Sequence, residues 1–191
     1  MVTSAPGVPG RGDRAGYSLA EMMAVIVVLG VVVSLAAPRI DLGRNRTDAA
    51  MAEIGTTILA AQRAAIGRQH DVVVSFDETA RSYRVHFDRN GNGAVDSGEY
   101  TRIEPLGESL RFGRGSAPTF RIGTAAVSYT RRQNGNKAVT FRRNGSASEE
   151  GGFYLSTVRG NASDARLVII DRATGRPSWF RYTGSQWTQE F

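Results

Sequence analysis

The most regular set of metal-binding residue types lies in one loop near the middle of the chain. From Asp88 to Glu99 the sequence matches the pattern D-x-[DN]-x-[DN]-G-x5-E at every fixed position. In a calcium loop of this kind, acidic and amide side chains and one backbone carbonyl supply oxygen ligands, and a glycine permits the sharp turn. The predicted ligands are Asp88, Asn90, Asn92, Ala94 (through its carbonyl), Asp96 and Glu99.

A plain turn is the alternative interpretation of this loop. Its flanks, Tyr83–Phe87 and Tyr100–Ile103, are strand-like, so it is not part of a helix-loop-helix unit. With three carboxylates the calcium affinity should be weak, about 10⁻⁴–10⁻³ M. An Asn-Gly turn with solvated acids explains the same residues. Calcium is therefore the only cofactor that the sequence suggests.

Arginine dominates the basic residues. Of 24 basic side chains only Lys137 is a lysine, and the formal net charge is +6. If several arginines share one face, phosphate binding with a steep salt dependence follows, and aromatic side chains can stack on bases. The alternative is arginines that solvate strands around aromatic core residues. The relevant side chains are Arg114, Arg121, Arg131, Arg132, Arg142, Arg143, Arg172, Arg176, Arg181, Trp179, Phe180 and Trp187.

No pattern of catalytic residues is present in the sequence. The chain has no cysteine, which excludes thiolate metal sites and cysteine nucleophiles, and its only imidazoles are His70 and His86. It lacks HExxH, GxSxG and a glycine loop followed by a phosphate-binding lysine. The sequence therefore predicts a protein that is not an enzyme.

One long apolar segment lies near the N-terminus. Leu19 to Ala37 contains a single charge, Glu21, and with Pro38 it is about 20 residues long, enough for a helix of about 30 Å. Its Leu, Ile and Val side chains contribute about −3 to −6 kcal/mol to membrane insertion. A membrane-spanning helix is predicted. A buried core helix and a secretory signal are alternatives that explain its length and lack of a polar face less well.

The start of this segment resembles the type IV prepilin signature. Gly16-Tyr17-Ser18-Leu19-Ala20-Glu21 precedes the apolar helix, and Pro38 follows about twenty residues on. Tyr17 stands where the family usually has Phe, and Ala20 replaces a larger aliphatic residue. The resemblance implies cleavage between Gly16 and Tyr17 by the prepilin peptidase, N-methylation of Tyr17, and a topology with the N-terminus on the cytoplasmic side.

Glu21 also has a physical role to play in assembly. A carboxylate in a membrane persists only where a partner neutralises it. After cleavage, the free amine of Tyr17 on a neighbouring subunit could pair with Glu21, so that assembly removes two costly charges. The alternative is a glutamate that reaches the lipid headgroups.

An amphipathic helix is predicted after the apolar segment. The stretch 39–46 should form a bend or weak helix, with helix resuming at a cap near Thr47-Asp48 and ending by Gly67 or Arg68. Apolar residues recur every three or four positions along it. They are Met51, Ile54, Ile58, Ala61 and Ala65, and Leu59 and Ile66 are predicted to widen the stripe.

The remainder alternates with a period of two, which predicts antiparallel strands. The expected strands cover 72–76, 83–87, 125–130, 138–142, 153–157, 167–171 and 178–182, with glycine-containing turns between them. The fold class expected is α+β: an N-terminal transmembrane helix continues into an amphipathic helix packed on an antiparallel sheet, the lollipop shape of pilins by resemblance.

The C-terminal part is similar to the H-type minor pseudopilins of type II secretion and to FimT-like minor pilins. The similarity includes the 88–99 hairpin, Phe141-Arg-Arg-Asn-Gly and Thr174-Gly175-Arg176. The expected domains are a leader at 1–16, a transmembrane and assembly helix at 17–38, an extracytoplasmic helix at 39–69, and a β domain at 70–191.

The resemblance implies a minor pseudopilin, a structural subunit of a type II secretion pseudopilus or type IV pilus. It would be anchored in the bacterial inner membrane with a periplasmic domain, and its partners would be other pilins or pseudopilins, the prepilin peptidase and the assembly platform. The alternative is a minor pilin that binds DNA for uptake. The Gly-Arg-x-Arg motif of such receptors is incomplete, since Gly175-Arg176 lacks the second arginine and only Arg181 lies nearby.

Overall fold

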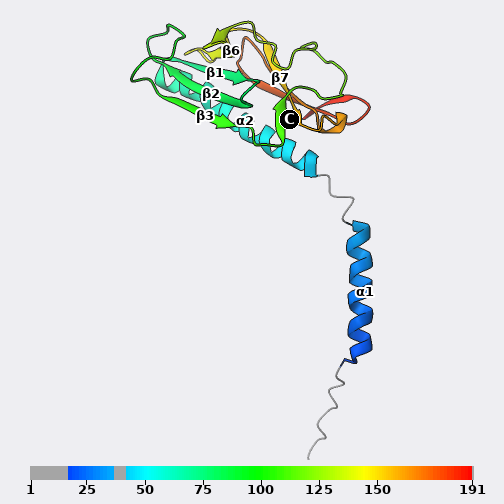
Figure 1. Cartoon of the computed structure of the whole chain (residues 1–191). Helices are drawn as coiled ribbons and strands as arrows, with labels where there is room; N and C mark the ends of the chain where they lie inside the picture. The colour runs from blue at the N-terminus through cyan, green and yellow to red at the C-terminus, as the bar shows by residue number, and fades with distance from the viewer. Residues whose placement is uncertain (1–16, 37–41, 191) are drawn as a thin grey trace, which may run out of the picture. The chain divides into compact units, whose positions relative to one another are not determined.

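The computed structural model describes residues 17–36 and 42–190, which belong to two separate compact units (Figure 1). The predicted leader, residues 1–16, and the segment 37–41 lie outside the described residues. The helix of the first unit, α1, spans Leu19–Ala36. In the described parts of the chain, no helix combines the length and the apolar character needed to cross a membrane.

The second unit begins with one uninterrupted helix, α2, over Leu42–Arg68. Of the two alternatives predicted for 39–46, the helix is correct from Leu42 onward and the bend is wrong there. The predicted helix start at Thr47-Asp48 is also wrong. Thr47 lies inside the helix, where its hydroxyl donates to the Gly43 carbonyl at 2.9 Å. Gly43 packs against the buried Asp164, whose Oδ2 would lie 3.1 Å from a Cβ at that position. This contact supports the first turn, which local sequence signals do not indicate.

Within residues 42–190, ten short strands form two antiparallel sheets of five strands each. The first sheet has the order β3-β2-β1-β6-β5, and the second has the order β10-β9-β8-β7-β4. The strands are β1 (Asp71–Asp77), β2 (Ser82–Asp88), β3 (Thr101–Pro105), β4 (Leu110–Phe112), β5 (Arg132–Gln133), β6 (Asn136–Phe141), β7 (Gly151–Thr157), β8 (Arg166–Ile170), β9 (Pro177–Tyr182) and β10 (Trp187–Glu190). A short 3-10 helix, η2 (Ala162–Asp164), precedes β8.

The core lies where α2 meets both sheets. The predicted stripe of α2 is buried, with Ile54, Ile58 and Ala65 at most 1% exposed, but Ile66, which was predicted to widen it, is 45% exposed. The helix contacts strands of each sheet. Phe76 of β1 packs against Phe153 of β7, with ring centroids 4.8 Å apart. The two sheets and the helix therefore share one hydrophobic core.

The predicted strand at 125–130 is wrong. This segment makes only one isolated bridge, between Val127 and Phe153, and is otherwise irregular. Two of its backbone groups bond to the backbone of β7, since the Ser128 N–H donates to the Gly152 carbonyl and the Ala126 carbonyl accepts from the Tyr154 N–H. The Val127 carbonyl accepts from Lys137 Nζ at 2.6 Å, so no regular ladder forms. Buried Val127 and Tyr129 produce the alternation that led to the prediction. The strands β4, β5 and β10 were not predicted.

Candidate functional site

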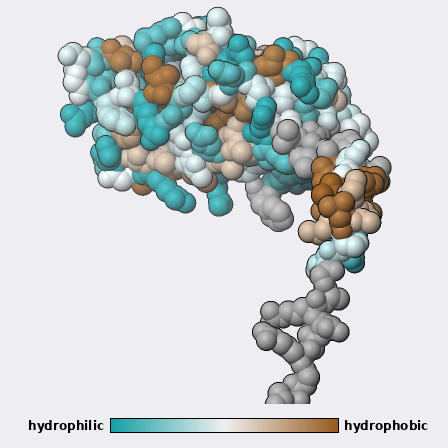
Figure 2. Space-filling model, turned by 60° about the horizontal axis from the view of Figure 1, so that its bottom comes forward, coloured by the Kyte–Doolittle hydropathy of each residue, from teal (hydrophilic) through white to brown (hydrophobic). Residues whose placement is uncertain are grey.

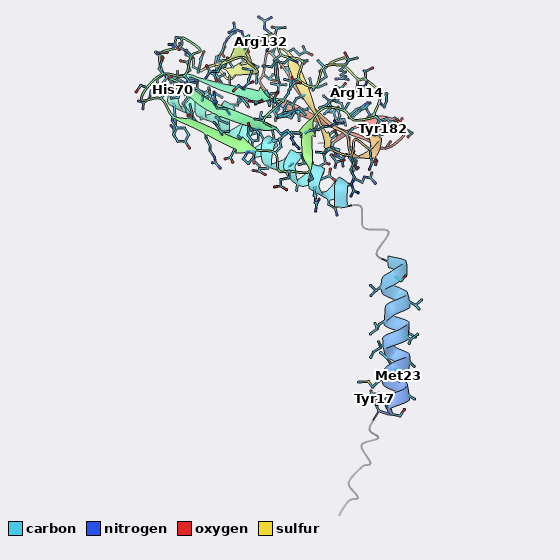
Figure 3. All side chains as sticks on the ribbon, viewed as in Figure 1. Tyr17, Met23, His70, Arg114, Arg132 and Tyr182 are labelled. Atoms are coloured by element: carbon cyan, nitrogen blue, oxygen red, sulfur yellow. The ribbon has the colours of Figure 1, made fainter. Side chains whose placement is uncertain are left out.

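The helix α1 begins at the residues of the predicted prepilin signature. Ser18 precedes the first helical residue, and its Oγ accepts a hydrogen bond from the Glu21 backbone N–H at 3.2 Å. This is one half of a capping box, with Glu21 at the third helical position. Figure 3 shows Tyr17 at the start of α1, and its side chain is 79% exposed. The first turn therefore presents a carboxylate close to the predicted new N-terminus. Gly16 lies outside the described residues.

The surface of α1 is apolar around its circumference. From Leu19 to Val33 its large hydrophobic side chains are between 49% and 81% exposed. Figure 2 shows brown, apolar side chains on the visible part of α1, whereas the visible face of the second unit is mostly teal and white. A contiguous apolar surface of this kind normally marks contact with another protein or a membrane.

The predicted calcium loop is closed by internal hydrogen bonds. Both carboxylate oxygens of Asp88 accept backbone N–H groups, from Gly91 and Gly93 at 2.7 Å each. Asp88 itself is 2% exposed. An aspartate that accepts several backbone donors two to five residues on holds a turn without any metal. Ala94, the predicted carbonyl ligand, donates its N–H to Asn92 Oδ1 at 2.8 Å.

The two asparagines turn their amide N–H groups toward Asp96. Asn90 Nδ2 and Asn92 Nδ2 lie 2.8 and 2.6 Å from Asp96 Oδ2. Over residues 17–36 and 42–190, no three His, Asp or Glu side chains are grouped so that they could hold a metal ion. Calcium binding requires both amides to turn their oxygens inward, and it stays a prediction.

Glu99 is instead held by a buried histidine that the sequence did not assign to the loop. His86 Nε2 lies 2.7 Å from Glu99 Oε2, and the Arg89 N–H donates to Glu99 Oε1 at 2.8 Å. The hydrogen bond from His86, followed by those from the backbone of Arg89 and Asp96, lowers the Glu99 pKa to about 2 although burial opposes this shift. Glu99 therefore stays ionised under physiological conditions.

Gln133 connects this pair to the loop. Its Nε2 lies 2.9 Å from His86 Nδ1 and 2.9 Å from the Gly93 carbonyl. His86 is fully buried on the face of β2 opposite to Val85. The sequence contains only a weak signal for the contact of His86 with Glu99, because the alternation places His86 on the face of the strand predicted to be solvent-exposed. These hydrogen bonds hold the loop against β2.

The two predicted DNA-binding arginines do not lie together. Arg176 is exposed in the turn before β9, and Arg181 lies near the other end of that strand. Arg181 Nε is 2.9 Å from Glu190 Oε1, so its charge is neutralised by β10.

Three other arginines lie near Arg176, in two adjacent loops. The loops 142–147 and 171–176 are adjacent, since the Ala147 N–H donates to the Arg172 carbonyl at 2.9 Å. Gln62 of α2 donates to carbonyls in both loops. These loops carry Arg142, Arg143, Arg172 and Arg176, and they border a hollow of about 310 Å³ that Glu150 and Asp171 also line. The surface is thus arginine-rich but mixed in charge.

The remaining candidates serve other contacts. Arg132 lies in β5 of the first sheet, and Arg114 lies after β4 of the second, well apart in Figure 3. Arg121 covers the rings of Phe120 and Phe180. Trp187 stacks on Phe120 and donates to the Pro118 carbonyl at 3.1 Å. Packing therefore accounts for most of the aromatic side chains that could have stacked on bases.

Comparison with known proteins identifies two family matches. The model of the family "Type II transport protein GspH" matches residues 50–174, and the "Prokaryotic N-terminal methylation motif" matches residues 11–37. The chain is 34% identical over 87 residues to the pilin-like protein PilA1 of Thermus thermophilus. That match covers 45% of this chain and 56% of the relative, so the chain spans little more than half of the curated relative it matches.

Two solved structures share the fold. The minor pseudopilin EpsH of the type 2 secretion system of Vibrio cholerae superposes with a TM-score of 0.50 at 12% identity, covering 74% of this chain and 99% of that one. The type IV minor pilin FimU of Pseudomonas aeruginosa gives a TM-score of 0.50 at 15% identity, covering 77% of this chain and 96% of that one. These likenesses confirm the predicted pilin-like α+β fold.

Proposed function

The chain belongs to the GspH family of type II transport proteins, a family of pilin-like structural subunits rather than enzymes, and we propose that it is a minor pseudopilin of a type II secretion pseudopilus. In this role the domain 42–190 is displayed outside the cytoplasmic membrane. The apolar helix α1 anchors the subunit before assembly and packs against other subunits after it. The assembly platform and the other pseudopilins are its proposed partners.

The observation that carries the proposal is the combination at the start of α1. A methylation motif covers residues 11–37, and a helix with an exposed apolar circumference begins directly after Tyr17 and Ser18. Glu21 is the one acidic residue of α1 and lies in its first turn. Cleavage after Gly16 would create an amine at Tyr17, and the Glu21 carboxylate of an incoming subunit would neutralise the amine of its neighbour. In an apolar environment the desolvation cost of the Tyr17 amine or of the Glu21 carboxylate alone is high, and the cost of the two as an ion pair is much smaller.

Mass spectrometry of the mature full-length chain tests processing. We expect a chain that starts at Tyr17 and carries one additional methyl group on its amine. A Gly16 substitution to a bulky residue should leave the leader attached. A mature chain that retains Met1, or that starts at Arg39, would exclude the proposal.

Deletion of the gene separates secretion from other pilus functions. A pseudopilin deletion should trap folded exoproteins in the periplasm while surface pili and DNA uptake are unchanged. Complementation by the full chain should restore secretion. Normal secretion together with lost pili would assign the protein to a type IV pilus.

DNA binding is a second candidate function, favoured by the adjacent loops that carry Arg142 and Arg172. Contacts with phosphates would lose affinity steeply as the salt concentration rises. A mobility shift at two salt concentrations tests this, with the double variant Arg142→Ala/Arg172→Ala and the exposed Arg89→Ala as a matched control. Absence of a shift at low salt removes this candidate, and equal shifts of both variants would place the contact elsewhere.

A further inference from the structure

The strand β3 forms an open edge of the first sheet. Thr101–Pro105 pairs with β2 on one side, and none of the strands in the described residues pairs with its other side. Ile103, at its centre, is 56% exposed, and only Glu104 of the five residues is half-buried. An exposed edge with an apolar centre is a template for pairing with another strand.

The hydrogen bonds to β2 show which backbone groups point outward. The Phe87 N–H donates to the Tyr100 carbonyl at 3.0 Å, and the Leu106 N–H donates to the Arg81 carbonyl at 2.9 Å. Since hydrogen-bonded pairs alternate along an antiparallel ladder, Arg102 and Glu104 also bond to β2. The N–H and C=O groups of Thr101 and Ile103, and the C=O of Pro105, therefore face the open side.

The charges of β3 are symmetric about its centre. Arg102 and Glu104 flank Ile103 with opposite signs on the same face of the sheet, and within one chain they form an ion pair. We propose that β3 pairs with β3 of a second copy of this chain, antiparallel and with the twofold axis at Ile103. This register places Arg102 opposite Glu104 of the partner subunit, and the reciprocal pair follows from the symmetry. The two ion pairs thereby join into a cluster of four charges with alternating sign.

The same register satisfies the outward backbone groups. The two Ile103 residues exchange both of their N–H and C=O groups, and the Thr101 N–H donates to the carbonyl of Pro105 of the partner subunit. Because Pro105 has no N–H, one interchain hydrogen bond, to the Thr101 carbonyl, is missing at each end of the paired strands. Four backbone hydrogen bonds and two charge pairs between the chains result, without a change in the β2–β3 ladder.

Charged side chains on an edge strand usually prevent edge-to-edge pairing. Here the two charges select the partner instead. An identical antiparallel strand places opposite charges across from both Arg102 and Glu104, whereas a strand with a different order of charges places a like charge across from at least one of them. Because the contact is small, the dimer should be weak and dependent on concentration. An isologous contact closes at two subunits, so it is distinct from the repeating contacts of a filament. The proposal does not depend on which secretion or pilus system the protein serves.

Cysteine cross-linking of the full-length chain tests the register, because the natural chain has no cysteine. A hydrogen-bonded antiparallel pair has a Cα–Cα distance of about 5.5 Å, which suits a disulfide. Under mild oxidation Ile103→Cys should therefore form disulfide dimers. Thr101→Cys is the matched control, since its copies lie about 14 Å apart along the strand and should cross-link at least about tenfold less.

Charge exchange provides the second measurement, made on the Ile103→Cys background. Arg102→Glu or Glu104→Arg alone should reduce cross-linking, because each places like charges opposite one another. The double exchange Arg102→Glu/Glu104→Arg should restore it. Equal cross-linking at residues 101 and 103, no dimer of Ile103→Cys at millimolar protein, or no rescue by the double exchange would overturn the proposal. Unchanged thermal unfolding of each variant verifies that the fold is intact.

Discussion

The two units of this chain differ in how they place their apolar side chains. The unit 42–190 buries a contiguous core between α2 and two sheets, and its polar groups are largely paired within it. The helix α1 buries nothing within its own unit, and its large apolar side chains from Leu19 to Val33 are all exposed. The unit 42–190 covers most of its own apolar side chains, whereas those of α1 are left uncovered by the residues of its own unit that the structure describes. A contiguous exposed apolar surface normally contacts another protein or a membrane.

The proposed function would give the two units separate tasks. The residues that we propose for assembly, Tyr17 and Glu21, lie close together in sequence at the start of α1. The residues that hold the domain together come from distant parts of the chain, as in the contact of Arg166 with Asp48, 118 positions apart. Variants should therefore affect assembly or folding, and seldom both.

The largest expected effect separates the two units most clearly. Glu21→Ala should abolish incorporation into filaments, because the Tyr17 amine of the neighbour would be left without a partner in an apolar environment. The thermal unfolding of the unit 42–190 should be unchanged. Quantifying the variant in sheared filaments measures the effect, with the exposed Glu53→Ala of α2 as control. Normal incorporation would show that the carboxylate has no role in assembly.

A substitution in the core should have the opposite effect to Glu21→Ala: it should lower the stability of the unit 42–190. Ile58 of α2 is fully buried, and Ile58→Ala should lower the free energy of unfolding by about 2–5 kcal/mol through lost burial and a cavity. Ile66→Ala, at a side chain 45% exposed, should cost less than about 1 kcal/mol. Urea unfolding of the fragment that begins at Leu42 measures both. Equal losses would mean that α2 is not packed as described.

Two glycines of α2 should respond with opposite signs. A Cβ at Gly55 would lie 2.6 Å from Trp179 Cη2, so Gly55→Ala should destabilise the fold by about 1–3 kcal/mol through overpacking. Gly67 has no atom within 4 Å of such a Cβ, and Gly67→Ala should stabilise by about 0.5–1 kcal/mol. The same unfolding assay compares them. Stabilisation by both variants would show that the Trp179 ring moves aside freely.

Acid should weaken the domain through Glu99. Its pKa is lowered to about 2 in the folded state, chiefly by the hydrogen bond from His86. The contribution is therefore complete above the ordinary pKa of about 4.5 and is lost as the pH falls toward 2. The unfolding temperature of the natural chain should drop over this interval more than that of Glu99→Gln. Parallel profiles would contradict a stabilising role for the hydrogen bond between His86 and Glu99.

Calcium tests whether the 88–99 loop can rearrange. If it binds weakly, the free energy of unfolding should rise by about 1.4 kcal/mol at a calcium concentration ten times the dissociation constant. Asp96→Asn should remove most of this increase. No shift in the unfolding temperature at millimolar calcium would retire the site and leave the loop as a hydrogen-bonded turn.

The sequence determined the features whose cause is local. The residues Gly16, Tyr17 and Glu21 lie within one short segment, and the helix begins where their spacing indicates. The predicted inward positions of β1 and the main stripe of α2 are buried, since period and burial are read from neighbouring positions. The alternation did not predict that Val73, Ser75 and His86 on the opposite faces of β1 and β2 are buried too. Composition alone excludes thiolate chemistry, because the chain contains no cysteine.

Only the tertiary structure decided the features whose partners are distant. Alternation at 125–130 could not reveal that the Lys137 side chain bonds to the Val127 carbonyl, and no local signal marks the contact of Gly43 with Asp164. The Glu99 carboxylate fits a calcium pattern in sequence, yet in the fold it meets His86, which Gln133 holds from its other side. The physical reason is the same in each case. The free energy of a buried polar group depends on which partner the fold brings to it, and residue type alone does not specify that partner.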